Sequence, residues 1–313
     1  MEFRALGSSG LSVVPIMLGG NVFGWTADAP TSHAILDTYV AGGGNFIDTA
    51  DVYSAFAPGN VGGESETIIG EWLKRSGKRH DIIIATKVGM LDGEGGSGLK
   101  GTRIAAAAEA SLKRLQTDVI DLYFAHRDDP DTPLAETLEA LDRLVKTGKV
   151  RAIGASNYSA SRLAEALAIS DQNGWARFTA LQPEYHLLKR DDYEGPLQRL
   201  ALAETIGVVP YYGLANGYLT GKYRTAADLS GVRSGGAKAY MDGKGPAMLA
   251  AMDGIAAETG ASLAAIALAW LKAQPGITAP IASASRPAQV ADLLAAAGLT
   301  LSDDQLARLT AAG

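Results

Sequence analysis

The chain of 313 residues contains no cysteine. Disulfide bonds and thiolate metal sites are therefore excluded, and a reducing compartment is the simplest location. No apolar run approaches the roughly 18 residues of a membrane span, and the N-terminal residues Met1 to Arg4 are not a basic region followed by an apolar stretch. We therefore expect a cytoplasmic protein that is neither exported nor anchored in a membrane.

Strong charge of one sign is also absent. The formal net charge is −6 and no run of lysines and arginines occurs, which argues against nucleic acid or an anionic membrane as a partner. The chain is 47% hydrophobic and 20% charged, as in ordinary globular proteins. We expect residues 1–313 to form one domain, because α/β barrels of this length commonly do.

Short apolar runs recur along the chain and alternate with stretches in which apolar residues are spaced by three and four. The stretches at 104–115, 134–145 and 263–271 have this helical spacing, and Ser302 to Gln305 form a capping box that opens a last helix. Such alternation is typical of a parallel sheet covered by helices. Eight runs predict a (β/α)8 barrel: 15–19, 45–48, 82–86, 119–125, 150–154, 178–182, 207–211 and 277–281.

A doubly wound sheet is the competing fold, and one missing feature argues against it. Gly42 to Gly44 precede an apolar run, so the glycine-rich turn from strand to helix that binds dinucleotides in that fold does not occur. Residues 1–14 predict a hairpin that turns at Gly7 to Gly10. Two predicted loops, 91–101 and 213–245, are longer than a barrel needs, and long loops are usually functional or mobile.

Polar side chains follow nearly every apolar run. In a barrel these positions converge on the face where barrel enzymes keep their active sites. The residues are Gly20, Asn21, Asp48, Lys87, His126, Ser156, Asn157, Gln182, Tyr211 and Ser283.

Asp48, Lys87 and His126 follow three successive strands, and Tyr53 lies five residues after Asp48. A buried carboxylate needs a partner, so we expect Asp48 to pair with Lys87. A neighbouring ammonium favours the phenolate and lowers the pKa of a tyrosine, so Tyr53 is a candidate general acid. His126 is placed to hydrogen-bond the oxygen that Tyr53 protonates. One histidine, one aspartate and a lysine make a poor metal site, so we expect no metal.

These segments resemble the aldo-keto reductase family over nearly the whole chain. The matching stretches are Phe46-Ile-Asp-Thr-Ala-Asp-Val-Tyr53, Ala85-Thr-Lys87, Asp121-Leu-Tyr-Phe-Ala-His126, Gly154-Ala-Ser-Asn157, Leu181-Gln-Pro-Glu-Tyr185, the Tyr211 segment to Tyr223, and Pro280-Ile-Ala-Ser-Ala-Ser-Arg286. The resemblance implies a (β/α)8 barrel and reversible hydride transfer between a nicotinamide dinucleotide and a carbonyl or alcohol. It also implies a catalytic tetrad of Asp48, Tyr53, Lys87 and His126.

The resemblance further implies cofactor contacts. Ser156, Asn157 and Gln182 would bind the nicotinamide carboxamide, and the ring of Tyr211 would stack on the nicotinamide. Leu214, Lys222 and Arg233 would lie at the pyrophosphate, and the backbone of Gly20 and Asn21 would contact ribose. The segment after the eighth strand would bind adenosine and any 2′-phosphate, through Ser283, Ser285, Arg286, Gln289 and Asp292.

An arginine at a helix N-terminus suits a phosphate, so Arg286 favours NADP(H) over NAD(H). Trp25 and Phe56 are candidate substrate contacts at the mouth of the barrel. The substrate would be a small carbonyl or alcohol, and a homo-oligomer is compatible with the sequence. Three alternatives remain open: an NAD-dependent sugar or alcohol dehydrogenase, a non-catalytic cofactor-binding regulatory subunit, and a metal-dependent barrel hydrolase or isomerase.

Overall fold

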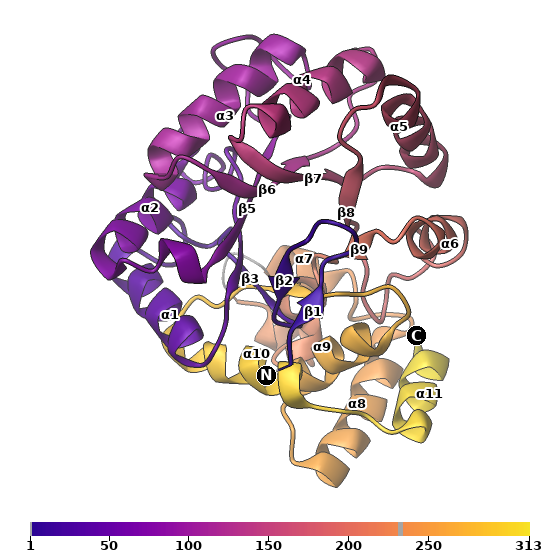
Figure 1. Ribbon diagram of the computed structural model, residues 1–313. Helices are drawn as coiled ribbons and strands as arrows, with labels where there is room; N and C mark the ends of the chain where they lie inside the picture. Colours follow the sequence, from indigo (N-terminus) through magenta and orange to yellow (C-terminus); the bar gives the residue numbers. More distant parts are fainter. Residues whose placement is uncertain (1, 231–233) are drawn as a thin grey trace.

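The protein is an eight-stranded parallel barrel surrounded by helices, as the computed structural model of residues 2–230 and 234–313 shows (Figure 1). Neighbouring strands follow the order β10-β3-β4-β5-β6-β7-β8-β9. Their bounds are Met17–Gly19 (β3), Phe46–Asp48 (β4), Ile83–Val88 (β5), Ile120–Ala125 (β6), Val150–Ser156 (β7), Phe178–Gln182 (β8), Gly207–Val208 (β9) and Ile281–Ala282 (β10). All eight predicted strands are present, which confirms the predicted (β/α)8 barrel.

The last two strands are shorter than the apolar runs that predict them. Val208 forms a parallel bridge with Ile277, and the amide of Ile281 donates to the carbonyl of Pro210 at 2.8 Å, which closes the barrel between its first and last edges. Pro210 and Pro280 lack the N–H groups that would extend these ladders. The strand predicted at 277–281 therefore pairs with β3 only at Ile281 and Ala282.

Helices cover the outside of the barrel (Figure 1). The three helices predicted from apolar spacing are α3, α4 and α9, and the capping box at Ser302 opens α11 as expected. The bounds are Ala29–Ala41 (α1), Glu64–Ser76 (α2), Gly101–Leu115 (α3), Leu134–Lys146 (α4), Ala160–Asn173 (α5), Pro196–Ala203 (α6), Ser234–Lys238 (α7), Gly245–Thr259 (α8), Leu263–Ala273 (α9), Val290–Gly298 (α10) and Asp303–Ala312 (α11).

An antiparallel hairpin of β1 (Arg4–Ala5) and β2 (Ser12–Val13) lies across one end of the barrel (Figure 1). Leu6 and Leu11 of its turn pack into the apolar cluster of inward-facing strand residues such as Phe46 and Phe124. The amide of Ser8 donates to the carbonyl of Thr205, just before β9. The hairpin therefore fills the amino-terminal end and leaves the opposite end for a site.

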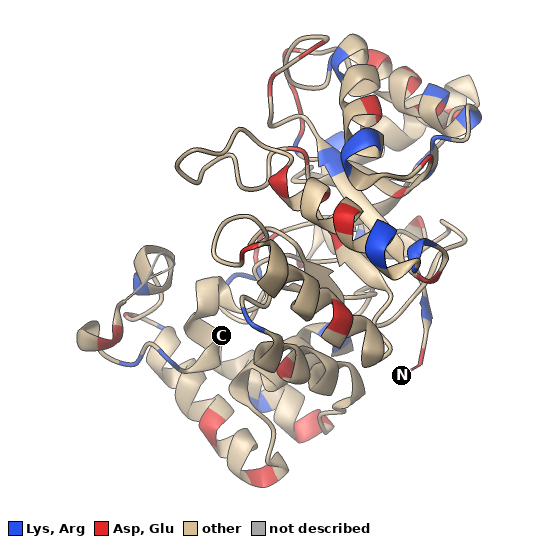
Figure 2. Cartoon of the chain, turned by 90° about the vertical axis from the view of Figure 1, so that its left-hand side faces the viewer, with Lys and Arg blue, Asp and Glu red and all other residues tan. Residues whose placement is uncertain are grey.

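The two long loops contain more local structure than their sequence predicts. Gly93 and Gly96 exchange two backbone hydrogen bonds of 3.0 Å, which make a small turn inside 91–101. The segment 213–245 includes α7 and the 3₁₀ helices Ala215–Thr220 and Ala226–Asp228. Positions of basic and acidic residues are interspersed along the helices in Figure 2.

Within the described residues, no single helix is long and apolar enough to cross a membrane. Helices α8 and α9 pass that test only as a pair, and they meet at a bend of 97°.

Candidate active site

The carboxyl ends of β4, β5 and β6 place Asp48, Lys87 and His126 side by side. Asp48 is the last residue of β4, Lys87 lies near the end of β5, and His126 directly follows β6. The parallel register pairs Asp48 with Ala85 and Lys87 with Phe124. The predicted convergence of these strand ends is therefore present.

Lys87 contacts both Tyr53 and Asp48. Its Nζ lies 2.7 Å from the hydroxyl of Tyr53 and 2.7 Å from Asp48 Oδ1, and it donates to the carbonyl of Thr49 at 2.8 Å. The Tyr53 hydroxyl donates to Asp48 Oδ2 at 3.0 Å. The side chain of Gln182 donates to Asp48 Oδ1 at 3.0 Å. Both carboxylate oxygens of the buried Asp48 are thus bonded.

The pKa of Tyr53 is shifted upward, not downward as the sequence argument predicts. Burial and the Asp48 carboxylate both raise the pKa of this phenol well above its ordinary value. Because the hydroxyl donates to Asp48, losing its proton would place two anions 3.0 Å apart. The expected lowering by Lys87 is therefore wrong for this arrangement, and Tyr53 holds its proton at neutral pH.

The pKa values of Lys87 and His126 are both lowered, as burial does to basic groups. Burial lowers the pKa of Lys87, and the adjacent Asp48 opposes this effect. Burial, Lys87 and Arg127 hold the pKa of His126 well below its usual range, so its imidazole is neutral at physiological pH. Its Nδ1 is buried without a hydrogen-bond partner among the described residues. The His126 and Tyr53 rings meet edge to face, with centroids 6.0 Å apart.

Ser156, Asn157, Gln182 and Tyr211 form one hydrogen-bonded group beside this cluster. The Ser156 hydroxyl donates to the carbonyl of Gln182 at 2.8 Å. Asn157 is in the left-handed region at φ 57°, and its side-chain amide donates to the carbonyl of His126 at 3.0 Å. The Tyr211 hydroxyl donates to Asn157 Oδ1 at 2.7 Å. The structure therefore brings these four predicted residues together.

The first and last strands contribute a second group. The Ser283 hydroxyl donates to Asn21 Oδ1 at 2.6 Å. The backbone of Gly20 donates to the carbonyl of Asp48 at 2.7 Å. A Cβ on Gly20 would lie 2.9 Å from that carbonyl and from the Ser65 hydroxyl, so this position requires glycine. Gly20 is thereby fixed against the residue that anchors Lys87.

The segment after β10 is ordered by its own contacts. The amide and the hydroxyl of Ser285 both donate to Gln289 Oε1, at 2.8 and 3.2 Å. Arg286 is exposed, and in the described part of the chain it forms no ion pair. Asp292 lies in the first turn of α10. No ion pair between Asp292 and Arg286 occurs among those residues.

The segment after β9 has an unusual backbone. Tyr212, Ala215 and Asn216 all have positive φ, between 47° and 57°, and Gly217 follows at 88°. Leu214 accepts hydrogen bonds from the amides of Gly217 and Leu219. Such conformations cost non-glycine residues free energy and are concentrated at functional sites.

Of the two cations predicted at the pyrophosphate, one can be described. Lys222 is exposed, and its Nζ lies 4.7 Å from the ring centre of Tyr223. Arg233 lies outside the described residues.

The predicted substrate contacts Trp25 and Phe56 touch each other, edge to face, with centroids 4.9 Å apart. Phe56 is 57% exposed, although it is a large apolar side chain. The sequence does not predict the contact of Gln182 with Asp48 or the carbonyl of Thr49 as a hydrogen-bond acceptor for Lys87. A backbone carbonyl carries no signal in the sequence, so the second contact required the structure.

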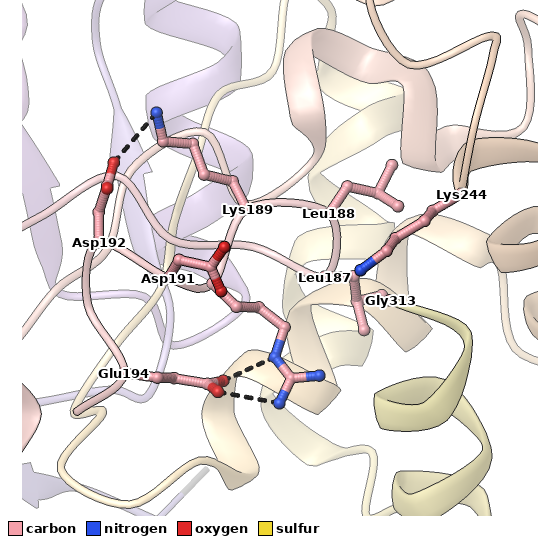
Figure 3. Close-up of a pocket in the computed structure, with 9 residues that line it drawn as sticks. Leu187, Leu188, Lys189, Asp191, Asp192, Glu194, Lys244 and Gly313 are labelled. Atoms are coloured by element: carbon pink, nitrogen blue, oxygen red, sulfur yellow. Dashed lines mark hydrogen bonds and ion pairs between the residues drawn. The ribbon is translucent and has the colours of Figure 1, made fainter.

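A cavity of about 410 Å³ lies elsewhere, and none of the predicted site residues lines it (Figure 3). Lys189 and Arg190, two of its cations, are paired with Asp192 and Glu194. In residues 2–230 and 234–313 no group of three or more His, Asp or Glu side chains is placed to hold a metal. The lining residues are Leu187, Leu188, Lys189, Arg190, Asp191, Asp192, Glu194, Lys244 and Gly313.

A (β/α)8 barrel with a buried lysine, aspartate and tyrosine in contact at its carboxyl end defines a class of barrel proteins equipped for proton transfer. The family model described as the aldo/keto reductase family matches residues 15–313. The chain therefore belongs to the aldo/keto reductase family, which confirms the resemblance seen in the sequence.

Three relatives illustrate the range of this family. An uncharacterized oxidoreductase of Bacillus subtilis, YrpG, is 34% identical, covering 99% of this chain and 94% of its own length. The aldo-keto reductase YhdN of the same organism is 33% identical, covering 97% and 92%. A probable voltage-gated potassium channel subunit beta of Arabidopsis thaliana is 33% identical, covering 93% and 89%.

Proposed function

We propose that this family member is an NADP(H)-dependent oxidoreductase that interconverts an aldehyde or ketone and the corresponding alcohol. One observation carries the proposal: Lys87 Nζ lies 2.7 Å from the Tyr53 hydroxyl and 2.7 Å from Asp48 in a buried site at the carboxyl end of the barrel. This arrangement supplies a proton donor and the charge that stabilises its conjugate base.

Tyr53 acts as the general acid of reduction and as the general base of the reverse reaction. Its raised pKa keeps the phenol protonated before reaction, and the ammonium of Lys87 stabilises the phenolate as the proton moves to the carbonyl oxygen. Asp48 holds Lys87 in place. His126, neutral because of its lowered pKa, hydrogen-bonds the same carbonyl oxygen. The bound nicotinamide cofactor supplies or accepts the hydride.

The residues present fit a nicotinamide dinucleotide. Ser156, Asn157 and Gln182 present hydroxyl and amide groups beside Asp48 and suit the carboxamide, with Tyr211 stacking on the ring. Lys222 and Arg286 are exposed cations without ion pairs among the described residues, as phosphate ligands would be. We assign the remaining predicted contacts to ribose, pyrophosphate and adenosine as the resemblance implies: Gly20, Asn21, Leu214, Arg233, Ser283, Ser285, Gln289 and Asp292.

Replacing Tyr53 by phenylalanine tests the proposed function. Removing the hydroxyl is expected to lower kcat for an aldehyde by about 10²–10⁴-fold, the usual size of a general-acid contribution. Binding of NADPH, followed by its fluorescence, should change less than twofold. Tyr193→Phe is the matched control, because that buried hydroxyl has no hydrogen-bond partner among the described residues. A kcat of Tyr53→Phe close to that of the wild type would exclude Tyr53 as the proton donor.

The preference for NADP(H) rests on Arg286. Replacing Arg286 by methionine should raise KM for NADPH about tenfold or more, because a hydrogen-bonded charge pair is worth about 1.5–3 kcal/mol. KM for NADH should hardly change, which makes the NADH assay the internal control. Equal effects on both cofactors would contradict a role at the 2′-phosphate and favour the NAD-dependent dehydrogenase.

A non-catalytic cofactor-binding subunit is the second candidate, and the similarity to a probable potassium channel subunit beta supports it. A carbonyl screen that follows NADPH absorbance separates the two, because the subunit would bind NADPH without turnover. The same screen, applied to variants of Trp25 and Phe56, tests these residues as substrate contacts.

The single domain over residues 1–313, the cytoplasmic location and the homo-oligomer remain predictions.

A further inference from the structure

A second buried group of charges lies on the outer side of β5, against α2 and α3. We call it the Asp51 cluster, and it consists of Asp51, Glu66, Arg103 and Arg114. Glu66 is fully buried and accepts hydrogen bonds from the Thr86 hydroxyl and, at 2.7 Å, from Arg114 Nε. Because side chains alternate along a strand, Thr86 faces the helices, whereas its neighbour Lys87 faces the barrel interior.

Arg103, in the first turn of α3, connects three parts of the chain. Its Nη2 lies 3.3 Å from Asp51 Oδ2. Its Nε donates to the carbonyl of Leu91 at 3.0 Å, and its Nη1 donates to the carbonyl of Glu94 at 3.1 Å. The side chain is 6% exposed. One buried guanidinium therefore holds both the segment of Asp51 and the glycine-rich loop that follows β5.

Asp51 is itself attached to the candidate catalytic residues. Its amide donates to the carbonyl of Lys87 at 3.2 Å. Tyr53 is two residues further on, and the Tyr53 amide donates to the carbonyl of Ala50 at 3.2 Å. A displacement of Asp51 would therefore be passed directly to the backbone that positions Tyr53.

The glycine-rich loop, residues 91–96, lies at the carboxyl end of the barrel, where the candidate active site also lies. It begins three residues after β5 ends at Val88. A Cβ on Gly62 would lie 2.8 Å from the Leu91 side chain, so this loop packs closely on the segment that follows Tyr53. Met90, just before the loop, is 44% exposed. A shift of the loop would change the space available to a substrate.

The Asp51 carboxyl is incompletely bonded. Its Oδ1 is buried without a hydrogen-bond partner among the described residues, as is the Tyr123 hydroxyl. Burial and the charge of Glu66 raise the pKa of Asp51 to about 7, against the opposing effect of the arginines. The titratable and charged groups that interact electrostatically with it are Glu66 from α2, Arg103 and Arg114 from α3, Tyr123 from β6 and, from the interior side of β5, Lys87.

We propose that Asp51 and Arg103 are a positioning pair that holds the glycine-rich loop against the segment carrying Tyr53. An ionised Asp51 attracts Arg103 and so fixes the carbonyls of Leu91 and Glu94. A protonated Asp51 loses this attraction and loosens the loop. The pair touches no reacting atom, and its effect on catalysis rests on the proposed function of Tyr53.

The first test compares the pH dependence of carbonyl reduction in the wild type and in Asp51→Asn. In the wild type, KM for the aldehyde should rise several-fold as the pH falls from 8 to 6, because Asp51 becomes protonated, and kcat should change less than twofold. Neither Tyr53 nor His126 titrates in this range, since their pKa values are shifted away from it in opposite directions. Asp51→Asn should show the higher KM at both pH values. A variant that keeps the wild-type pH dependence would overturn the proposal.

The second test does not depend on turnover. A glutamyl endopeptidase cleaves after Glu94, whose side chain is exposed and whose carbonyl is held by Arg103. Cleavage there, identified by mass spectrometry and normalised to a peptide substrate at each pH, should be several-fold faster in Asp51→Asn at pH 8. The wild type should reach a similar rate at pH 6.

Two further variants keep this test decisive. Asp37→Asn removes a carboxylate from an exposed pair with Arg75 and should cleave at the wild-type rate. Arg103→Lys keeps the charge but loses donors, and it should cleave faster even if Asp51→Asn fails to fold. Unchanged cleavage in Arg103→Lys would refute the positioning pair. Faster cleavage without any carbonyl turnover would support the pair and contradict the proposed function instead.

Discussion

Asp48 and Asp51 are three residues apart, both are buried, and each lies beside a cation, yet their surroundings differ. Asp48 accepts hydrogen bonds from Lys87, Tyr53 and Gln182, and both of its oxygens are bonded. Asp51 has one contact of 3.3 Å with Arg103, and its second oxygen has no partner among the described residues. A buried carboxylate is stable as an anion only where its surroundings supply enough donors.

The two carboxylates differ in hydrogen bonding because they lie on opposite sides of the barrel wall. Asp48 points with Lys87 toward the barrel mouth, where polar strand ends converge from several directions. Asp51 has left the strand and faces the layer between β5 and α3, where its side chain accepts one hydrogen bond, from Arg103, among the described residues. Glu66, a second anion in that layer, further disfavours the Asp51 anion. One short segment thus contains a carboxylate with both oxygens hydrogen-bonded and another whose pKa burial and Glu66 raise to about 7.

Replacing Lys87 is expected to have the largest effect on the environment of Asp48, on stability and on activity. Lys87→Met leaves Asp48 without its cation, and breaking a buried pair from one side usually costs about 3–5 kcal/mol. The free energy of unfolding, measured by urea titration, should fall by that amount. Turnover of any aldehyde should be lost as well, because Tyr53 loses the group that stabilises its phenolate.

The double variant Lys87→Met with Asp48→Asn is the control for that loss. It removes both charges, so it should regain a large part of the stability while remaining inactive. A single variant as stable as the wild type would show that Asp48 does not depend on Lys87.

Most of the barrel could be predicted because the fold leaves a periodic signal. The strands β4 to β8 are near-continuous apolar runs, and the polar residue after each run marks the mouth. The lengths of β9 and β10 were overestimated, because hydrophobic character alone did not account for Pro210 and Pro280. Short turns of helix in 213–245 were missed, since they depend on local backbone contacts such as those of Leu214.

At the site, the identities of the side chains could be predicted, but their hydrogen-bond partners could not. The side chains at the strand ends are visible in the sequence, so Asp48, Tyr53, Lys87 and His126 could be named before the structure. The donor bonded to each acceptor is not visible, and the pKa of Tyr53 was therefore assigned the wrong direction. Asp51 lies inside the recognised motif, but its contact with Arg103, 52 residues away, depends on how α3 packs.

A smaller effect, with the opposite sign, is expected when Asp51 is replaced by asparagine. The folded-state pKa of Asp51, about 7, lies above the ordinary value near 3.9. The stability that this group contributes is therefore fully present below about pH 4 and is lost as pH rises toward and through 7. Asp51→Asn has no charge to bury, so at pH 8 its free energy of unfolding should exceed that of the wild type by about 1–3 kcal/mol.

Thermal unfolding of the wild type and of Asp51→Asn, each at pH 5 and pH 8, measures this effect. The quantity compared is the difference in Tm between the two proteins at each pH. The gain in Tm from Asp51→Asn should be several degrees at pH 8 and clearly smaller at pH 5. Asp37→Asn should behave in the opposite way. Partial burial raises the pKa of Asp37, but hydrogen bonds from Trp72 and Arg75 outweigh it and hold this pKa below its usual value. If Asp51→Asn lowers Tm at pH 8, the surroundings of Asp51 stabilise its anion, and the contrast between the two carboxylates does not hold.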